Sequence, residues 1–213
     1  MKAVIVGASG LVGSILLNKL LNDPLILQVI SFSRRPLEVQ NTKLTQIIAS
    51  NLEDLEKFSD QLVGDFYFCC LGTTIKTAGT KENFIKVDLD AVVHFAEIAK
   101  KHHAKSFVVI SSMGADSNSI FFYNKTKGQM EEAISKLGLP CVTIFRPSLL
   151  IGKRAEKRAA ENFAIKTYSA LGPILPQALC RAFGTKAEVL SGKMLENAKL
   201  MKPGIEIMLA SEI

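Results

Sequence analysis

Residues 4–13 read VIVGASGLVG, a short β-branched run that breaks into glycines spaced G-x-x-G-x-x-G. The run predicts a strand over residues 3–6 that ends at Gly7. The apolar spacing that follows predicts a helix over residues 10–22, which begins inside the glycine segment and stops at Asp23-Pro24. A strand that passes through a glycine turn directly into a helix is typical of parallel α/β folds, so this stretch decides the fold class.

The same turn predicts a phosphate site. Glycine has no Cβ, so the backbone can approach a pyrophosphate closely, and the helix can pack tightly on the strand. The helix N-terminus offers N–H groups and a partial positive charge to the phosphates. The residues expected to hold a dinucleotide here are Gly7, Ser9, Gly10, Leu11, Val12 and Gly13.

The rest of the chain continues the alternation of short apolar runs and helical patterns. The expected strands cover residues 27–33, 44–49, 66–71, 106–110 and 141–145, with an edge strand at 205–209. The expected helices cover residues 80–101, 119–137, 156–171 and 185–202, with a further helix that carries Leu52, Leu55 and Leu62. Such alternation implies right-handed crossovers and a parallel sheet covered on both faces.

We therefore expect an α/β fold of the Rossmann type, a doubly wound parallel sheet with helices on both faces and a small C-terminal elaboration. No linker, repeat or low-complexity segment divides the 213 residues, so residues 1–213 are expected to form a single domain. Open α/β sheets bind ligands beyond the carboxyl ends of their strands, which places residues from about 150 to 213 on the substrate side.

Composition and charge limit the class of protein. Hydrophobic residues make up 48 % of the chain and charged residues 22 %, which indicates a globular protein with a large core. The net charge of +6 is scattered, apart from a short basic run. That run consists of Lys153, Arg154, Lys157 and Arg158. In the absence of a recognition motif, we expect a solvated surface and no nucleic-acid partner.

The cysteines and the N-terminus suggest a cytoplasmic protein without metal. None of the four cysteines has C-x-x-C spacing, and each lies in an apolar run, which favours reduced, buried thiols over a disulfide framework or a zinc site. No apolar run approaches the ~18 residues of a membrane span. The apolar run at the N-terminus is too short for the apolar core of a signal peptide, so the expected location is the cytoplasm.

The end of the second expected strand selects the cofactor. NAD-binding proteins usually carry an acid about 20 residues past the glycines, on the ribose hydroxyls. Here that position reads Ser33-Arg34-Arg35, and no Asp or Glu occurs between Val29 and Leu37. Guanidinium groups offer planar, charged donors that suit a 2′-phosphate. Arg34 and Arg35 therefore predict NADP(H).

Catalytic chemistry is predicted between the fifth and sixth expected strands. Ser111-Ser112 ends one strand, and Tyr123 and Lys127 follow four residues apart on a predicted helix, so their side chains share a face. A nearby ammonium favours the phenolate and is expected to lower the pKa of Tyr123. Such a tyrosine can exchange a proton with a carbonyl or alcohol while a cofactor moves a hydride, and a serine hydroxyl would polarise the carbonyl.

These residues carry a family resemblance. The glycine motif, the Ser111-Ser112 strand end and Tyr123-x-x-x-Lys127 resemble the short-chain dehydrogenase/reductase superfamily. More narrowly, the chain resembles its atypical branch, the Tat-interacting-protein type of NADP-binding oxidoreductases, over about residues 3–158. The motifs that carry this narrower resemblance are Phe68-Cys69-Cys70-Leu71-Gly72-Thr73-Thr74, Gly114-Ala115-Asp116, Lys127-Gly128 and Phe145-Arg146-Pro147.

The resemblance implies further site residues. It implies that NADP(H) is held by the glycine loop and the two arginines, and also by Leu71, Gly72, Tyr123, Lys127, Leu150 and Arg158. Aligned by motif, Ser112 is favoured over Ser111 as the catalytic serine, beside Tyr123 and Lys127. The chain departs from the family at Asn51, where an acid often follows the third strand. The Ser112–Tyr123 segment is also short, which puts the reach of the serine in doubt.

Two functions from different classes stay open, with a third behind them. The first is an NADP(H)-dependent oxidoreductase that acts on a small carbonyl or alcohol. The second is an NADP(H)-binding sensor or regulatory protein with weak or no catalysis. The third, a regulator bound to nucleic acid, has only the basic charge to support it. Motifs alone do not separate the first two, because function depends on the substrate site.

Overall fold

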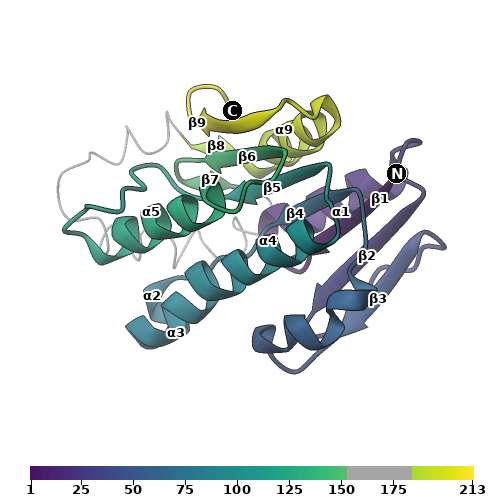
Figure 1. Ribbon diagram of the computed structural model, residues 1–213, viewed down its shortest axis with the longest axis horizontal. Helices are drawn as coiled ribbons and strands as arrows, with labels where there is room; N and C mark the ends of the chain where they lie inside the picture. Colours follow the sequence, from purple (N-terminus) through teal and green to yellow (C-terminus); the bar gives the residue numbers. More distant parts are fainter. Residues whose placement is uncertain (153–183) are drawn as a thin grey trace.

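A computed structural model describes residues 1–152 and 184–213 of the chain. Its centre is a parallel sheet of seven strands in the order β3-β2-β1-β4-β5-β6-β9 (Figure 1). Its strands are β1 (Lys2–Val6), β2 (Gln28–Ser33), β3 (Leu44–Ile48), β4 (Phe66–Cys69), β5 (Ser106–Ile110), β6 (Cys141–Arg146) and β9 (Gly204–Leu209). A separate parallel pair joins β7 (Leu150–Ile151) to β8 (Thr185–Lys186). The strand order is that of a doubly wound Rossmann sheet, so the predicted fold class is confirmed.

Helical segments connect the strands. They are α1 (Leu11–Asn22), η1 (Leu52–Gln61), α2 (Ile75–Ala78), α3 (Lys81–Ile85), η2 (Lys86–Asp90), α4 (Ala91–Lys101), α5 (Phe122–Ser135) and α9 (Ala187–Leu200). Helices α1 and α9 pack against each other over one face of the sheet, and α4 and α5 lie side by side over the other (Figure 1). The inner strands are thus covered on both faces.

Strand β4 shows how this arrangement dictates composition. Its four residues are all buried. Phe66 and Phe68 pack toward α1 and α9, whereas Tyr67 and Cys69 pack toward α4 and η1. A strand buried on both faces reads as a continuous apolar run, which is why its sequence lacks polar alternation. Burial of each large side chain stabilises the fold by about 1.5–3 kcal/mol.

The helix expected over residues 80–101 is divided in three. It begins as predicted, because Thr80 accepts a hydrogen bond from the backbone N–H of Asn83 and caps α3. Residues 86–90 then form a π-helical turn, η2, before α4 continues as a regular helix. π-turns inside α-helices are often found at functional sites. This one contains Asp88, a fully buried acid.

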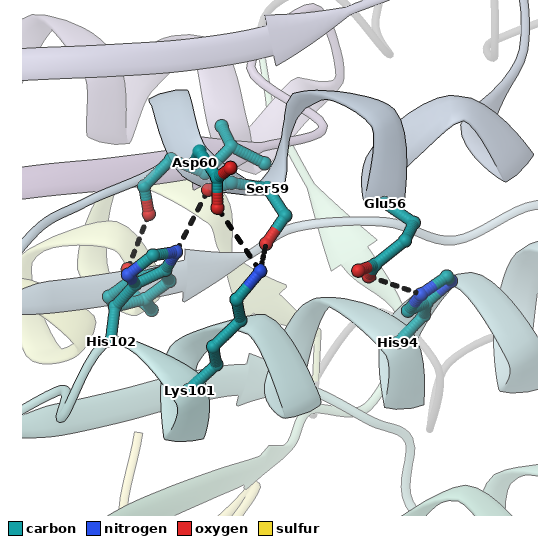
Figure 2. Close-up of polar contacts among 8 residues, drawn as sticks. Glu56, Ser59, Asp60, His94, Lys101 and His102 are labelled. Carbon is teal, nitrogen blue, oxygen red and sulfur yellow. Dashed lines mark hydrogen bonds and ion pairs between the residues drawn. The ribbon is translucent and has the colours of Figure 1, made fainter.

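The segment expected as a helix around Leu55 is the 3₁₀ helix η1, which polar contacts join to α4. Figure 2 shows His94 facing Glu56 and Lys101 facing Asp60. His94 Nε2 lies 3.1 Å from Glu56 Oε2, and Lys101 Nζ lies 3.1 Å from Asp60 Oδ1. The Lys101 ammonium also donates to Ser59 Oγ at 2.9 Å, and the same serine's carbonyl lies 2.9 Å from His102 Nε2. Most of these charged side chains are exposed, unlike Asp88.

The end of the chain completes the sheet. Strand β9 pairs in parallel with β6 and lies at the sheet edge, as the sequence predicted for residues 205–209. Helix α9 covers the same edge beside α1. These elements extend the Rossmann layers, while the assignment of residues from about 150 onward to the substrate side stays a prediction. The helix expected at 156–171 and the basic run that begins at Lys153 lie outside the described residues.

Candidate functional site

The candidate site lies where the chain reverses its direction of winding across the sheet. Strands β1 and β4 are paired neighbours, with Val6 opposite Cys69. After β1 the chain enters α1 on one face, and after β4 it enters η2 and α4 on the other. Such a switch point leaves a crevice outside the carboxyl ends of the strands, and ligands of open α/β sheets bind there.

The glycine turn at this point is built so closely that two of its glycines admit no side chain. Gly7 has a φ of +79°, and a Cβ there would lie 2.4 Å from the carbonyl oxygen of Cys70. A Cβ on Gly13 would lie 2.1 Å from the carbonyl oxygen of Gly7. At Gly10 the nearest such atom is 3.3 Å away, and the residue is exposed. Gly10, the middle glycine of the motif, therefore presents open backbone outward.

Helix α1 begins at this open backbone. Gly10 is its N-cap, and no side chain of the described residues caps it. The first amide groups of the helix, in Leu11, Val12 and Gly13, precede the first turn of helical hydrogen bonding. An exposed, cap-free N-terminus of a twelve-residue helix beside a glycine cradle fits the pyrophosphate of a dinucleotide. Ser9 lies exposed in the same turn.

The two arginines are placed beyond β2. Arg34 and Arg35 are exposed, and within the described residues neither guanidinium has a hydrogen-bond or ion-pair partner. The backbone under them is fixed, because Ser33 Oγ donates to the carbonyl oxygen of Arg35 at 2.7 Å. Both cations are thus free to meet a phosphate at the carboxyl edge of the sheet.

Of the residues implied by resemblance alone, some follow β4 or lie in β7, and one lies outside the described residues. Leu71 and Gly72 follow β4 directly, with Leu71 half-buried and Gly72 exposed, and the Cys70 N–H donates to Val6 O at 2.9 Å. Leu150 is half-buried in β7. The structure thus places the post-β4 loop beside the glycine turn. Arg158 lies outside the described residues.

The tyrosine and lysine both lie on α5, as predicted. Tyr123 is half-buried, with its ring centroid 5.5 Å from that of Phe84. Lys127 is buried, and its Nζ lies 2.7 Å from Oδ1 of the buried Asp88. Burial lowers the pKa of Lys127, but the Asp88 carboxylate outweighs it, so the pKa lies above its ordinary value. Lys127 is therefore a charged group held inside the protein.

The two serines at the end of β5 have different surroundings. Ser111 Oγ donates a short hydrogen bond to Glu131, and Arg146 binds the same carboxylate at 2.6 Å and 3.1 Å. Ser112 Oγ is buried, and no hydrogen bond to it is found in the part of the chain that the structure describes. Ser111 is thus engaged in a structural network, whereas the hydroxyl of Ser112 is available.

Sequence reasoning missed two acids, Asp88 and Glu131. Asp88 shares helical spacing with the buried Phe84, Ala91 and Phe95, so an acid on an otherwise apolar face was the available signal. Glu131 similarly lies on the buried side of α5 and neutralises Arg146. Buried charges are costly unless paired, which makes both acids noteworthy.

The described residues contain no group of three histidines, cysteines or acids that could hold a metal ion. A search of those same residues also finds no helix long and apolar enough to cross a membrane. Cys69, Cys70 and Cys141 are free thiols. Burial raises the pKa of Cys69 to about 12, so this thiol is neutral beside the Lys127 and Asp88 charges.

Comparison with known proteins identifies relatives along nearly the whole chain. A family model described as NAD(P)H-binding matches residues 7–166. Protein HTATIP2 of Rattus norvegicus is 34 % identical over 205 residues, which cover 94 % of this chain and 81 % of the relative. The mitochondrial protein fmp52 of Emericella nidulans is 33 % identical over 217 residues, covering 98 % and 91 %.

Solved structures show the same fold. MoeE5, solved with UDP-glucose and NAD, superposes with a TM-score of 0.74 at 16 % identity and covers 98 % of this chain and 75 % of its own. A short-chain dehydrogenase family protein of Francisella tularensis has a TM-score of 0.70 at 14 % identity, with coverage of 99 % and 98 %. At these identities the likeness establishes the fold alone.

The relatives correct one expectation. Several of them are named as mitochondrial FMP52 proteins, which points away from the expected cytoplasmic location. The expectation rested on the short apolar run of the first residues and on the absence of a membrane-spanning apolar run, and neither observation distinguishes the cytoplasm from a mitochondrion. The cytoplasmic assignment is therefore wrong by the standard of these relatives.

Proposed function

The chain belongs to the NAD(P)H-binding family of atypical short-chain dehydrogenases/reductases, similar to HTATIP2, and from this premise we propose an oxidoreductase function. Its proposed cofactor is NADP(H), and its proposed substrate is a small carbonyl compound or the corresponding alcohol. The nicotinamide, when bound, supplies or accepts the hydride. The protein binds and orients the reactants and moves the proton.

The observation that carries the proposal is the difference between the two serines. A buried hydroxyl without a partner costs about 1–3 kcal/mol, so native structures seldom keep one without a reason. Within the described residues Ser112 Oγ is such a hydroxyl, as are Ser31 Oγ and Ser106 Oγ, whereas Ser111 is bonded to Glu131. Of these three serines, Ser112 is the one that follows the carboxyl end of its strand, where ligands of open α/β sheets bind. A substrate carbonyl oxygen would satisfy the Ser112 hydroxyl. Ser112 is therefore assigned the donor that polarises the substrate.

The other proposed roles follow from position. Tyr123 gives its phenolic proton to the carbonyl oxygen in reduction and takes it back in oxidation. Lys127, four residues along α5, places its positive charge on the same helix as the phenol and contacts the ribose. The amide groups of Leu11, Val12 and Gly13 receive the pyrophosphate.

The remaining cofactor contacts complete the proposed site. Arg34 and Arg35 receive the 2′-phosphate with charged hydrogen bonds. Gly7 and Ser9 with Gly10 form the cradle. Leu71 and Gly72 line the cofactor from the end of β4, and Leu150 and Arg158 are proposed to line it from the C-terminal side.

Calorimetry with NADPH and NADH tests the cofactor site first. NADPH is expected to bind more tightly than NADH, and equal affinities would contradict the choice of cofactor. Gly10→Val should abolish binding and leave the circular dichroism spectrum unchanged, because a Cβ there meets only one backbone atom at 3.3 Å. Gly13→Val is the matched control that should unfold the turn itself, since its Cβ would meet Gly7 O at 2.1 Å.

Turnover of NADPH with a panel of aldehydes and ketones tests the chemistry. Tyr123→Phe keeps the ring and removes the proton, so kcat should fall by about 10²–10⁴-fold with cofactor affinity retained. Full activity of Tyr123→Phe would refute the proton-donor role. Ser112→Ala should lower kcat more than Ser111→Ala. Tight NADPH binding with no turnover of any carbonyl would instead identify a sensor.

A further inference from the structure

Asp88 is a fully buried acid that the proposed reaction does not use directly. One carboxylate oxygen lies 2.7 Å from Lys127 Nζ, and the other accepts the backbone N–H of Thr73 at 2.8 Å. Thr73 belongs to the loop after β4, next to Gly72. A single side chain thus joins α5 to the loop that is proposed to line the cofactor.

Stability alone is a weak reason for this arrangement. Removing two opposite charges from water costs several kcal/mol for each ion, and well-packed apolar residues often replace such pairs without loss. Lys127 is 4 % exposed and Asp88 is fully buried, so both carry that cost. The pair must therefore be explained by what it holds in place.

The backbone around Asp88 is also unusual. Residues 86–90 form the π-turn η2 between two α-helical segments. π-turns are rare, and those inside α-helices are frequently found at functional sites. Here the π-turn carries the acid that reaches Lys127. Local geometry and buried charge thus point to the same residue.

We propose that Asp88 is the positioning residue of the site, which holds the Lys127 ammonium in place and fixes the post-β4 loop through Thr73. This inference rests on the proposed function, because it assigns Asp88 a role in binding NADP(H). Asp88 touches neither cofactor nor substrate in this role. It acts through Lys127, whose remaining donors are left for the ribose.

The charges around Lys127 make the role measurable. The groups that act on it are Asp88 from η2, Tyr123 from α5 and Cys69 from β4. Cys69 is a neutral thiol, since burial raises its pKa to about 12. Burial alone would lower the pKa of Lys127, and Asp88 is the largest influence that opposes it. Without the carboxylate, Lys127 should therefore lose its proton at a lower pH.

The test is the pH dependence of NADPH binding by calorimetry, between pH 7 and pH 9.5, in a Tyr123→Phe background that removes the competing phenol. In the Tyr123→Phe protein that keeps Asp88, the affinity for NADPH should change by less than about threefold over this range, once the pH effect common to all variants is subtracted. In Asp88→Asn it should fall at least about tenfold, because loss of a partner charge shifts a pKa by about 1–3 units. Asp90→Asn, an exposed acid two residues along, is the matched control and should behave like the parent.

Each outcome has a distinct meaning. A purely structural role would weaken binding by the same factor at every pH, and that result would overturn the proposal. Asp88→Asn combined with Lys127→Arg should lose the pH dependence, since a guanidinium does not titrate in this range. If Asp88→Asn fails to fold, Asp88→Ser, which leaves room for water beside Lys127, replaces it. Failure of the unmodified protein to bind NADPH at pH 7 would refute the proposed function instead.

Discussion

The helical run from Lys81 to Lys101 carries two kinds of charged contact, which differ in depth far more than in length. Asp88 lies 2.7 Å from Lys127, with both side chains buried. Lys101 lies 3.1 Å from Asp60, with the two side chains 50 % and 90 % exposed. Exposed pairs gain little because water screens them and competes for them, whereas a buried charge that loses its partner has no alternative. Contact length is therefore a poor guide to consequence.

The largest effect should come from breaking the buried pair on one side. Lys127→Met leaves the Asp88 carboxylate buried against an apolar side chain, so the free energy of unfolding at pH 7 should fall by about 3–5 kcal/mol. Urea unfolding followed by circular dichroism measures it. Lys101→Met, which breaks the exposed pair with Asp60, is the control. Equal losses in the two variants would abolish the distinction between the pairs.

Removing both buried charges should restore most of that loss. In Asp88→Asn combined with Lys127→Met, the free energy of unfolding should lie within about 1.5 kcal/mol of the parent, because uncharged groups avoid the desolvation cost. The asparagine carbonyl oxygen still accepts the Thr73 N–H. NADPH affinity should not recover in the double variant. A double variant as unstable as Lys127→Met would show that the pair itself stabilises the fold.

Exposed charges can still matter when a ligand supplies their partner. Arg34 and Arg35 have none within the described residues, so their joint change to Ala should alter the free energy of unfolding by less than about 0.5 kcal/mol. NADPH affinity should fall at least about tenfold, because charged hydrogen bonds contribute about 1.5–3 kcal/mol each. NADH affinity should hardly change, and an equal fall for both cofactors would speak against the 2′-phosphate site.

The smallest effect is expected from breaking the exposed pair of Lys101 and Asp60. Asp60→Asn removes the ion pair with Lys101, whose ammonium still donates to Ser59. The melting temperature should fall by less than about 2 °C, and the difference should vanish in about 1 M salt, where charges are screened within about 3 Å. Thermal unfolding at low and high salt measures both quantities. A larger fall in melting temperature that did not depend on salt would show that this exposed pair behaves like the buried pair.

Features that depend on neighbouring residues could be predicted from the sequence, whereas the buried contact between distant residues could not. Periodicity located the strands and the glycine turn correctly because each depends on neighbouring residues and on burial on two faces. The Arg34-Arg35 and Tyr123–Lys127 pairs were likewise visible as short patterns. Asp88 was not, since its partner is 39 positions away in the sequence and only the fold brings them together. An acid in a helix is ordinarily assigned to the surface.

The π-turn could not be predicted from the sequence either, for the same reason as the Asp88 contact. Its i→i+5 hydrogen bonds depend on what surrounds residues 86–90, and helix propensity alone predicts a regular helix there. Motif alignment favoured Ser112 over Ser111, but the local sequence offers no physical reason for that choice. In the described part of the chain Glu131 reaches Ser111 from α5, whereas no hydrogen bond to Ser112 Oγ is found.

The wide turn at residues 86–90 limits how the length of the chain can change. Successive residues of an α-helix are rotated by about 100°, so a single deletion within η2 would turn α3 relative to α4 by about that angle. Either Phe84 or Asp88 would then leave its buried position, and both are fully buried. Substitutions can be absorbed one side chain at a time, but a deletion here displaces a whole helix face. The segment should therefore tolerate changes of residue type far better than changes of length.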